Sequence, residues 1–142
     1  MTQKATQLEA KVLVAGTAVG TALVLDEPLS LWGGLNPETG EIIDRRHPQA
    51  GQIVTGRVLV LPAGRGSSSA SSILLEAVKQ GTAPAAILTS ETDGILALGA
   101  AVAREMYDQS PPVLVLPANA YAQVQTGHFL QIASDGVVRI ER

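Results

Sequence analysis

The sequence predicts a mixed α/β domain with a parallel β–α–β–α–β core and β-rich ends. Three short apolar runs rich in β-branched residues, at 57–61, 85–88 and 113–116, indicate the core strands. Runs of this length are typical of strands that are covered on both faces. The two stretches between them have helical periodicity, and parallel strands joined by helices imply right-handed crossovers.

The outer elements are predicted from alternation and turn residues. Residues 1–7 are polar, and we expect them to be disordered, with one domain over 8–142. Outer strands are predicted at 10–15, 20–25, 129–132 and 137–140. Helices are predicted at 68–80 and 94–106, with a short one at 121–125. The polar run 89–93 can cap the second of these helices.

Composition excludes several classes of function. The net charge of −3 and the pI of about 5.3 give no electrostatic reason to bind nucleic acid or an acidic membrane. The chain has no cysteine for a disulfide, a zinc site or an iron–sulfur cluster, and we expect a cytoplasmic protein without a signal peptide or membrane span. Only 16% of the residues are charged, which indicates either a partner-covered surface or a small compact domain.

The first core strand leads into a turn rich in glycine and serine. Gly64 and Gly66 allow a positive φ and a close approach of the backbone to a ligand. Arg65 adds a cation, and five serines between 67 and 72 open the next helix, with Ser67 or Ser68 as its N-cap. A helix N-terminus favours an anion. The turn therefore predicts an anion site, although a flexible linker and simple capping are alternatives, and neither the Walker A motif nor the dinucleotide fingerprint fits.

A long irregular segment at 30–52 is the second candidate region. Loops of this length in a small domain are often functional. One interpretation is a surface loop that Trp32 anchors, and the other is a loop that borders a site or a partner. Histidine is the usual general base, so His47 is kept as a possible residue at the border of a site, together with Asp44. His47 and His128 are too few and too far apart to predict a metal site.

The segment and the turn together resemble the small subunit of the aconitase X family over about residues 10–140. The matching motifs are Trp32-Gly33-Gly34, Pro37, Thr39-Gly40, Ile43-Asp44, His47-Pro48 and Gly64 to Ser71. Thr89, Ser90 and Asp93 also fit. The resemblance implies a swivelling β/β/α domain and a cysteine-bearing large subunit that holds an iron–sulfur cluster, with no cofactor bound by this chain.

The same resemblance implies the chemistry. Family members dehydrate small hydroxy acids: cis-3-hydroxy-L-proline in bacteria and mevalonate 5-phosphate in archaea. Ser67 matches the catalytic serine and would act as general base, while the cluster in the large subunit acts as Lewis acid on the leaving hydroxyl. Arg65, Gly66, Ser68, Ser69 and Ser71 would bind substrate, with Asp44 and His47 at the border of the site.

One departure from the aconitases concerns substrate size. Aconitases proper continue the Gly-Ser-Ser turn with Arg-Glu, whereas this chain has Ser69-Ala70. The arginine that would bind a second substrate carboxylate is therefore missing, which favours a substrate smaller than a tricarboxylate. The alternatives are a phosphomevalonate dehydratase subunit, a non-catalytic interaction module, and a phosphohistidine swivelling domain, which would need histidine where Ser67 stands.

Overall fold

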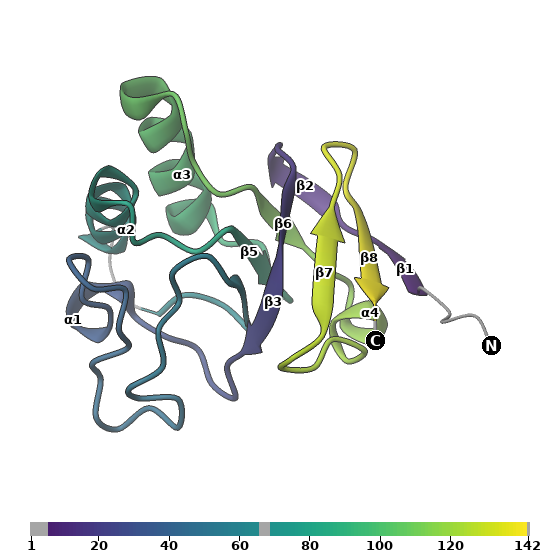
Figure 1. Cartoon of the computed structure of the whole chain (residues 1–142), viewed down its shortest axis with the longest axis horizontal. Helices are drawn as coiled ribbons and strands as arrows, with labels where there is room; N and C mark the ends of the chain where they lie inside the picture. The colour runs from purple at the N-terminus through teal and green to yellow at the C-terminus, as the bar shows by residue number, and fades with distance from the viewer. Residues whose placement is uncertain (1–5, 66–68, 142) are drawn as a thin grey trace.

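The computed structural model describes residues 6–65 and 69–141. The described strands are β1 (Thr6–Glu9), β2 (Lys11–Val14), β3 (Ala18–Val24), β4 (Val58–Leu61), β5 (Ala86–Thr89), β6 (Val113–Val115), β7 (Phe129–Ile132) and β8 (Val137–Glu141). The described helices are α1 (Leu31–Gly34), α2 (Ser69–Gln80), α3 (Gly94–Tyr107) and α4 (Ala118–Tyr121). Helices α1 to α3 lie on one side of the central strands β3 to β6, and the β7–β8 hairpin, which continues the sheet from β3, lies on the other (Figure 1).

The core is the predicted parallel β–α–β–α–β unit. Strands β4, β5 and β6 are adjacent and parallel, with α2 and α3 in the two crossovers. β3, which was predicted only as an outer strand, adds a fourth parallel strand beside β4. Alternate side chains of β4 enter two different cores. Leu59 and Leu61 pack with the helices, whereas Val58 and Val60 pack with the hairpin strands. The prediction that these strands are covered on both faces is confirmed.

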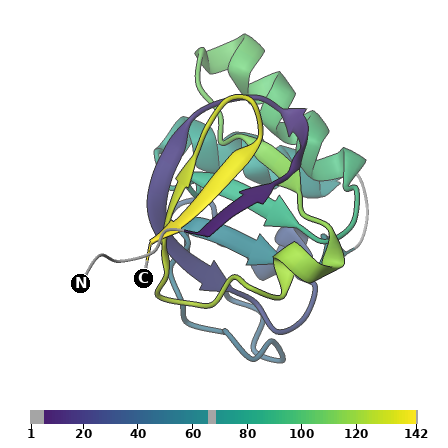
Figure 2. The ribbon, with the colours of Figure 1, turned by 90° about the vertical axis from the view of Figure 1, so that its right-hand side faces the viewer.

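The sheet nearly closes on itself through its first two strands. β1 pairs with β8 at one end of the strand order and β2 pairs with β6 at the other, and Ala10 alone separates β1 from β2. Figure 2 shows these purple strands lying beside the yellow hairpin. β1 begins at Thr6, inside the segment that we expected to be disordered, because β8 supplies hydrogen-bonding partners that a local reading does not reveal.

Most predicted boundaries agree with the structure to within a few residues. α3 and β7 begin at the predicted residues, and Asp93 caps α3 as expected. α4 begins at Ala118, ahead of the predicted 121–125, because Pro117 opens the turn. α2 is described from Ser69, and its expected first residue lies outside the described residues.

The segment between β3 and β4 contains the short helix α1 and a series of turns. Leu31, Leu35, Ile42 and Val54 are buried beneath it against the helical core. Trp32 is 61% exposed, so the interpretation of Trp32 as the anchor of this loop is wrong. The four buried aliphatic side chains take the anchoring role instead.

Candidate functional site

The candidate site lies at the carboxyl ends of the parallel strands. Because β4 and β5 are adjacent and parallel, the residues that follow them, 62–65 and 89–93, meet at the same edge of the sheet. The two segments are joined directly, since both the amide and the hydroxyl of Ser90 donate to the carbonyl oxygen of Pro62, at 3.2 Å and 3.1 Å. The beginning of the turn that leads to α2, at Pro62, is therefore fixed by Ser90.

Asp93 is the strongest link between the turn and α3. Its Oδ1 accepts from the amides of Ile95 and Leu96, at 3.0 Å and 2.9 Å, which caps α3. Its Oδ2 accepts from the amide of Gly64 at 2.7 Å. A Cβ on residue 64 would lie 2.7 Å from that Oδ2, so a side chain here would have to displace the Asp93 carboxylate. The close approach that we expected at Gly64 is thus made by a protein carboxylate, and Gly64 is not among the residues with positive φ.

The segment that follows β3 also contacts this edge of the sheet, through Leu29. The amide of Arg65 donates to the carbonyl oxygen of Leu29 at 3.1 Å, and the amide of Leu29 donates to Ala63 at 3.4 Å. These bonds form a parallel bridge between Leu29 and Gly64. The backbone of Arg65 is therefore held against Leu29, while its side chain is exposed. Sequence reasoning missed this contact, because a single β-bridge leaves no periodic pattern in the sequence.

The predicted serines are only partly described. Gly66, Ser67 and Ser68 lie outside the described residues, so their predicted roles remain predictions. Ser69 opens the described part of α2, and its carbonyl oxygen accepts from the hydroxyl of Ser72 at 2.7 Å. Ser71 lies on the side of α2 that meets α3, since a Cβ on Gly99 would lie 2.9 Å from its carbonyl oxygen. The described start of α2 therefore sits against α3, beside the Asp93 cap.

His47 is built into the fold. It is only 5% exposed, and its Nδ1 accepts from the amide of Gln49 at 3.0 Å. Nε2 lies 3.1 Å from the carbonyl oxygen of Glu27, so it carries the proton and donates. Nε2 thus ties the long segment to the chain that follows β3, and Nδ1 holds the turn at Gln49 within the segment. Asp44, also partly buried, accepts from the amide of Arg46 at 3.0 Å and shapes the turn that precedes His47.

Tyr121 of α4 is a residue near this edge whose pKa is shifted by its surroundings. Burial, together with the negative charge of Asp26 at the end of β3, raises the pKa of the Tyr121 phenol to about 12. Its hydroxyl is buried without a hydrogen-bond partner among the described residues. Sequence reasoning also missed this pair, because it depends on α4 folding back toward the end of β3.

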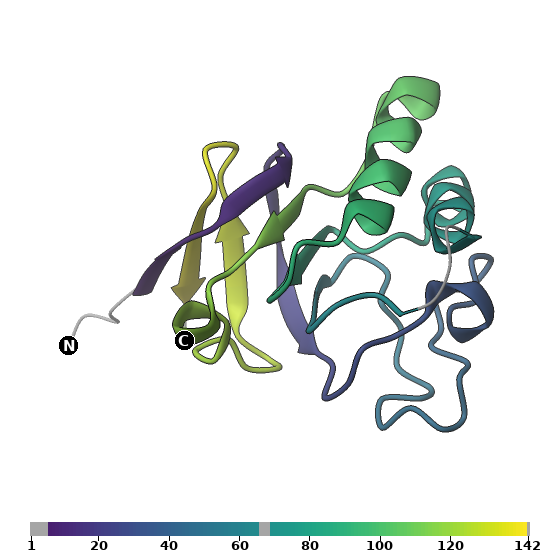
Figure 3. The same cartoon turned by 180° about the vertical axis from the view of Figure 1, so that it is seen from behind.

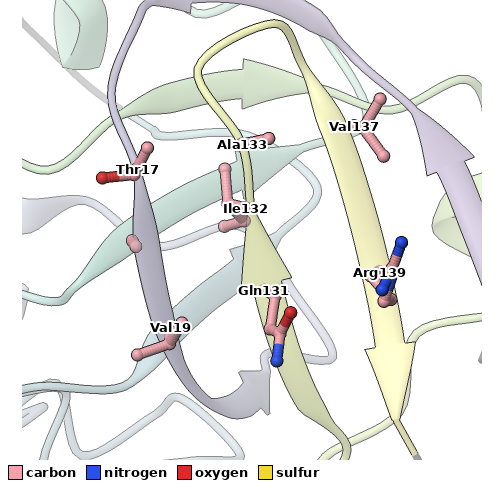
Figure 4. Close-up of a pocket in the computed structure, with 8 residues that line it drawn as sticks. Thr17, Val19, Gln131, Ile132, Ala133, Val137 and Arg139 are labelled. Carbon is pink, nitrogen blue, oxygen red and sulfur yellow. The ribbon is translucent and has the colours of Figure 1, made fainter.

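A hollow of about 590 Å³ opens elsewhere, on the outer face of β3, β7 and β8. Val19, Gln131 and Arg139 line it together with Thr17 and Val137 (Figure 4). Its lining residues come from β3, β7, β8 and the turns beside them, and none of them belongs to the candidate site. Figure 3 shows the yellow β7 and β8 at the opposite end of the molecule from the helices α1 and α2. Within 6–65 and 69–141 no group of three or more His, Cys, Asp or Glu side chains could hold a metal ion.

Comparison with known proteins identifies the family. The family model of the aconitase X swivel domain matches residues 7–140. The chain belongs to the aconitase X swivel-domain family. A crystal structure of Thermococcus kodakaraensis aconitase X in its holo-form has the same fold, with a TM-score of 0.85 and 31% identity over 95% of this chain and 98% of that chain. The predicted swivelling domain is confirmed.

Curated relatives of this swivel domain are dehydratases by name. It is 51% identical over 106 residues, 75% of its length, to cis-3-hydroxy-L-proline dehydratase of Pseudomonas aeruginosa, and 34% identical over 90% of its length to that of Hypocrea jecorina. It spans only 18% and 22% of those two proteins. The phosphomevalonate dehydratase small subunit of Methanosarcina acetivorans is 32% identical over 94% of this chain and 90% of that protein. No helix in the described part of the chain is long and apolar enough to cross a membrane.

Proposed function

We propose that this chain is the small subunit of a hydro-lyase that removes water from a small hydroxy acid, with cis-3-hydroxy-L-proline as its substrate. The observation that supports the proposal most is the braced edge that Asp93, Gly64 and Leu29 form at the start of α2, within a domain of the aconitase X family. The 51% identity to a relative named for this activity favours the substrate.

In this proposal Ser67 is the general base. It takes the proton from the carbon next to the substrate carboxylate, the electron pair forms the double bond, and the hydroxyl on the neighbouring carbon leaves. A free serine hydroxyl is too weak a base for this step. The first turn of α2 and the Arg65 cation favour its deprotonated form, because both stabilise an anion. Ser68, Ser69 and Ser71 are proposed to bind the carboxylate.

The iron–sulfur cluster of the family is assigned to the partner in this proposal. The chain has no cysteine, and its described residues hold no metal-binding group. These residues do not fit a cluster, so the departure of the hydroxyl group belongs to the large subunit. This chain contributes the base and the anion-binding helix start.

A second substrate is favoured by the small-subunit relatives. The relative from Methanosarcina acetivorans is named phosphomevalonate dehydratase small subunit and matches 94% of this chain. A phosphate would suit a serine-rich helix N-terminus equally well. Mevalonate 5-phosphate is therefore the second candidate substrate for the same site and the same base.

The test is turnover of both substrates by this chain co-expressed with the aconitase X-type large subunit of the same organism. Ser67→Ala is expected to lower kcat by about 10²- to 10⁴-fold, the usual contribution of a general base, with the complex still assembled. Ser72→Ala is the matched control, because its hydroxyl is exposed and donates to the carbonyl oxygen of Ser69 within α2. Full activity of Ser67→Ala would remove Ser67 from catalysis. A wild-type complex inactive on both substrates would overturn the proposed function.

A further inference from the structure

The helix α3 is apolar on all sides over most of its length. Its first ten residues, 94–103, include no polar side chain. Helices of this kind are normally buried all round, whereas a surface helix keeps a polar outer face. Within the described chain only one side of α3 is covered, through Leu96, Gly99, Ala100 and Ala103.

The uncovered side carries a stripe of large apolar residues. Leu98, Val102 and Met106 are 55%, 36% and 59% exposed. Their spacing of four residues places them on one face, over a length of about 12 Å. α2 provides an internal comparison, because its exposed residues Ser72 and Lys79 are polar or charged. The apolar outer face is therefore a property of α3 and not of the helical layer in general.

The stripe begins close to the candidate site along α3. Leu98 lies five residues after Asp93, which holds the turn before α2, and it adjoins Gly99, where α3 touches Ser71. α3 also lies on the same side of the sheet as α1 and α2 (Figures 1 and 3). A partner that completes the site at this edge would reach the first turns of α3.

The comparisons indicate how much protein is available to cover the stripe. About four-fifths of the two cis-3-hydroxy-L-proline dehydratases lies outside the part that matches this chain, which spans 18% and 22% of them. A second copy of this chain is a less favoured candidate to cover the stripe. A stable interface buries about 800 Å² on each partner, and three side chains in two turns supply much less unless the contact extends over the site edge.

We propose that Leu98, Val102 and Met106 form the contact surface of α3 for the large subunit. This inference rests on the proposed function, in which the chain works with such a subunit. The partner surface is expected to be apolar and to bury the stripe fully, with the charged Glu105 at its rim.

The experiment measures the dissociation constant between the purified large subunit and this chain. Leu98→Glu, alone and with Val102→Glu, is expected to raise the Kd by about tenfold or more, because a charge would have to be buried. Val19→Glu is the matched control, since Val19 is 58% exposed and lies on the outer face of β3, away from α3. Activity of the Leu98→Glu variant is expected to return when the large subunit is in excess.

Each other outcome overturns the inference. Unchanged affinity of the double variant would exclude the stripe, and so would a loss seen with Val19→Glu alone. A homodimer of this chain that Leu98→Glu dissociates would make a second copy the occupant. Failure of the wild-type chain to bind any large subunit would overturn the proposed function as well, and the wild-type arm separates that result from the others.

Discussion

At the scale of single residues, Asp93 both caps α3 and accepts from the amide of Gly64, and one asparagine could not do both. Three amides donate to its two oxygens, two from α3 and one from Gly64. The side-chain amide of Asn has a single acceptor oxygen, so Asp93→Asn can keep the α3 cap or the bond to Gly64, but not both. We expect a loss of about 1–3 kcal/mol in the free energy of unfolding, measured by urea titration.

Asp44→Asn is the control for this substitution. The Oδ1 of Asp44 accepts from the amide of Arg46, and the asparagine oxygen can do the same. Its effect is expected to stay within about 0.5 kcal/mol, as is usual for surface changes of this kind. Equal effects of the two substitutions would show that the bond to Gly64 contributes nothing.

Tyr121 gives the molecule a specific pH dependence. The folded chain raises its pKa from 10.0 to about 12, so the folded state keeps a proton that the unfolded state releases. The resulting stability is fully present below pH 10 and is lost as the pH rises toward 12. Tyr121→Phe is expected to remove this loss without lowering stability at neutral pH, because the buried hydroxyl has no described partner. Urea unfolding at neutral and alkaline pH tests both points, and parallel pH curves would contradict them.

At the scale of elements, the contact between α2 and α3 depends on Gly99. A Cβ there would lie 2.9 Å from the carbonyl oxygen and 3.1 Å from the Cα of Ser71. Because both neighbours are backbone atoms, Gly99→Ala is expected to push the helices apart and cost about 1–3 kcal/mol, which exceeds the gain in helix propensity of about 1 kcal/mol. Chemical denaturation measures the change.

Gly94 in the same helix is the matched control. A Cβ on Gly94 would meet nothing within 4 Å, so Gly94→Ala is expected to be neutral or mildly stabilising. If Gly99→Ala were equally harmless, the two helices would have to be free to separate at Ser71. The braced start of α2 would then be less rigid than the structure indicates.

At the scale of the whole molecule, closure of the sheet depends on the meeting of Ala10 with the β7–β8 turn. The amide of Ala10 donates to the carbonyl oxygen of Gly136 at 2.9 Å, and a Cβ on Gly136 would lie 2.6 Å from the oxygen of Ala10. Gly136→Ala therefore combines an unfavourable φ of 96° with a steric overlap. We expect it to destabilise the chain by about 1–3 kcal/mol more than Gly127→Ala, in matched unfolding curves.

Gly127 isolates the steric part of that effect. Its φ is 98°, close to that of Gly136, but a Cβ there would meet nothing within 4 Å. The backbone strain is therefore common to both variants, and the difference between them reports on the closure alone. Equal losses of stability in the two variants would mean that the contact between Ala10 and Gly136 adds little to stability.

Local sequence signals accounted for much of the fold. The apolar core strands, the capping run that ends at Asp93 and the two outer strands at 129–132 and 137–140 all depend on neighbours in the chain, and each was predicted close to its observed position. The candidate edge was also predictable in outline, because residues that follow adjacent parallel strands must meet. The bond between Asp93 and Gly64 could not be predicted in detail, since it joins side chain and backbone across two elements.

What the sequence determined by itself is the set of elements, their parallel core and the family to which the turn and the long segment belong, since these depend on local pattern and residue identity. Tertiary structure alone decided which elements meet. It paired Thr6–Glu9 with β8, exposed Trp32, tied both nitrogens of His47 into the fold and left one side of α3 uncovered. These outcomes depend on burial and hydrogen bonding between distant segments, for which a single sequence carries no local signal.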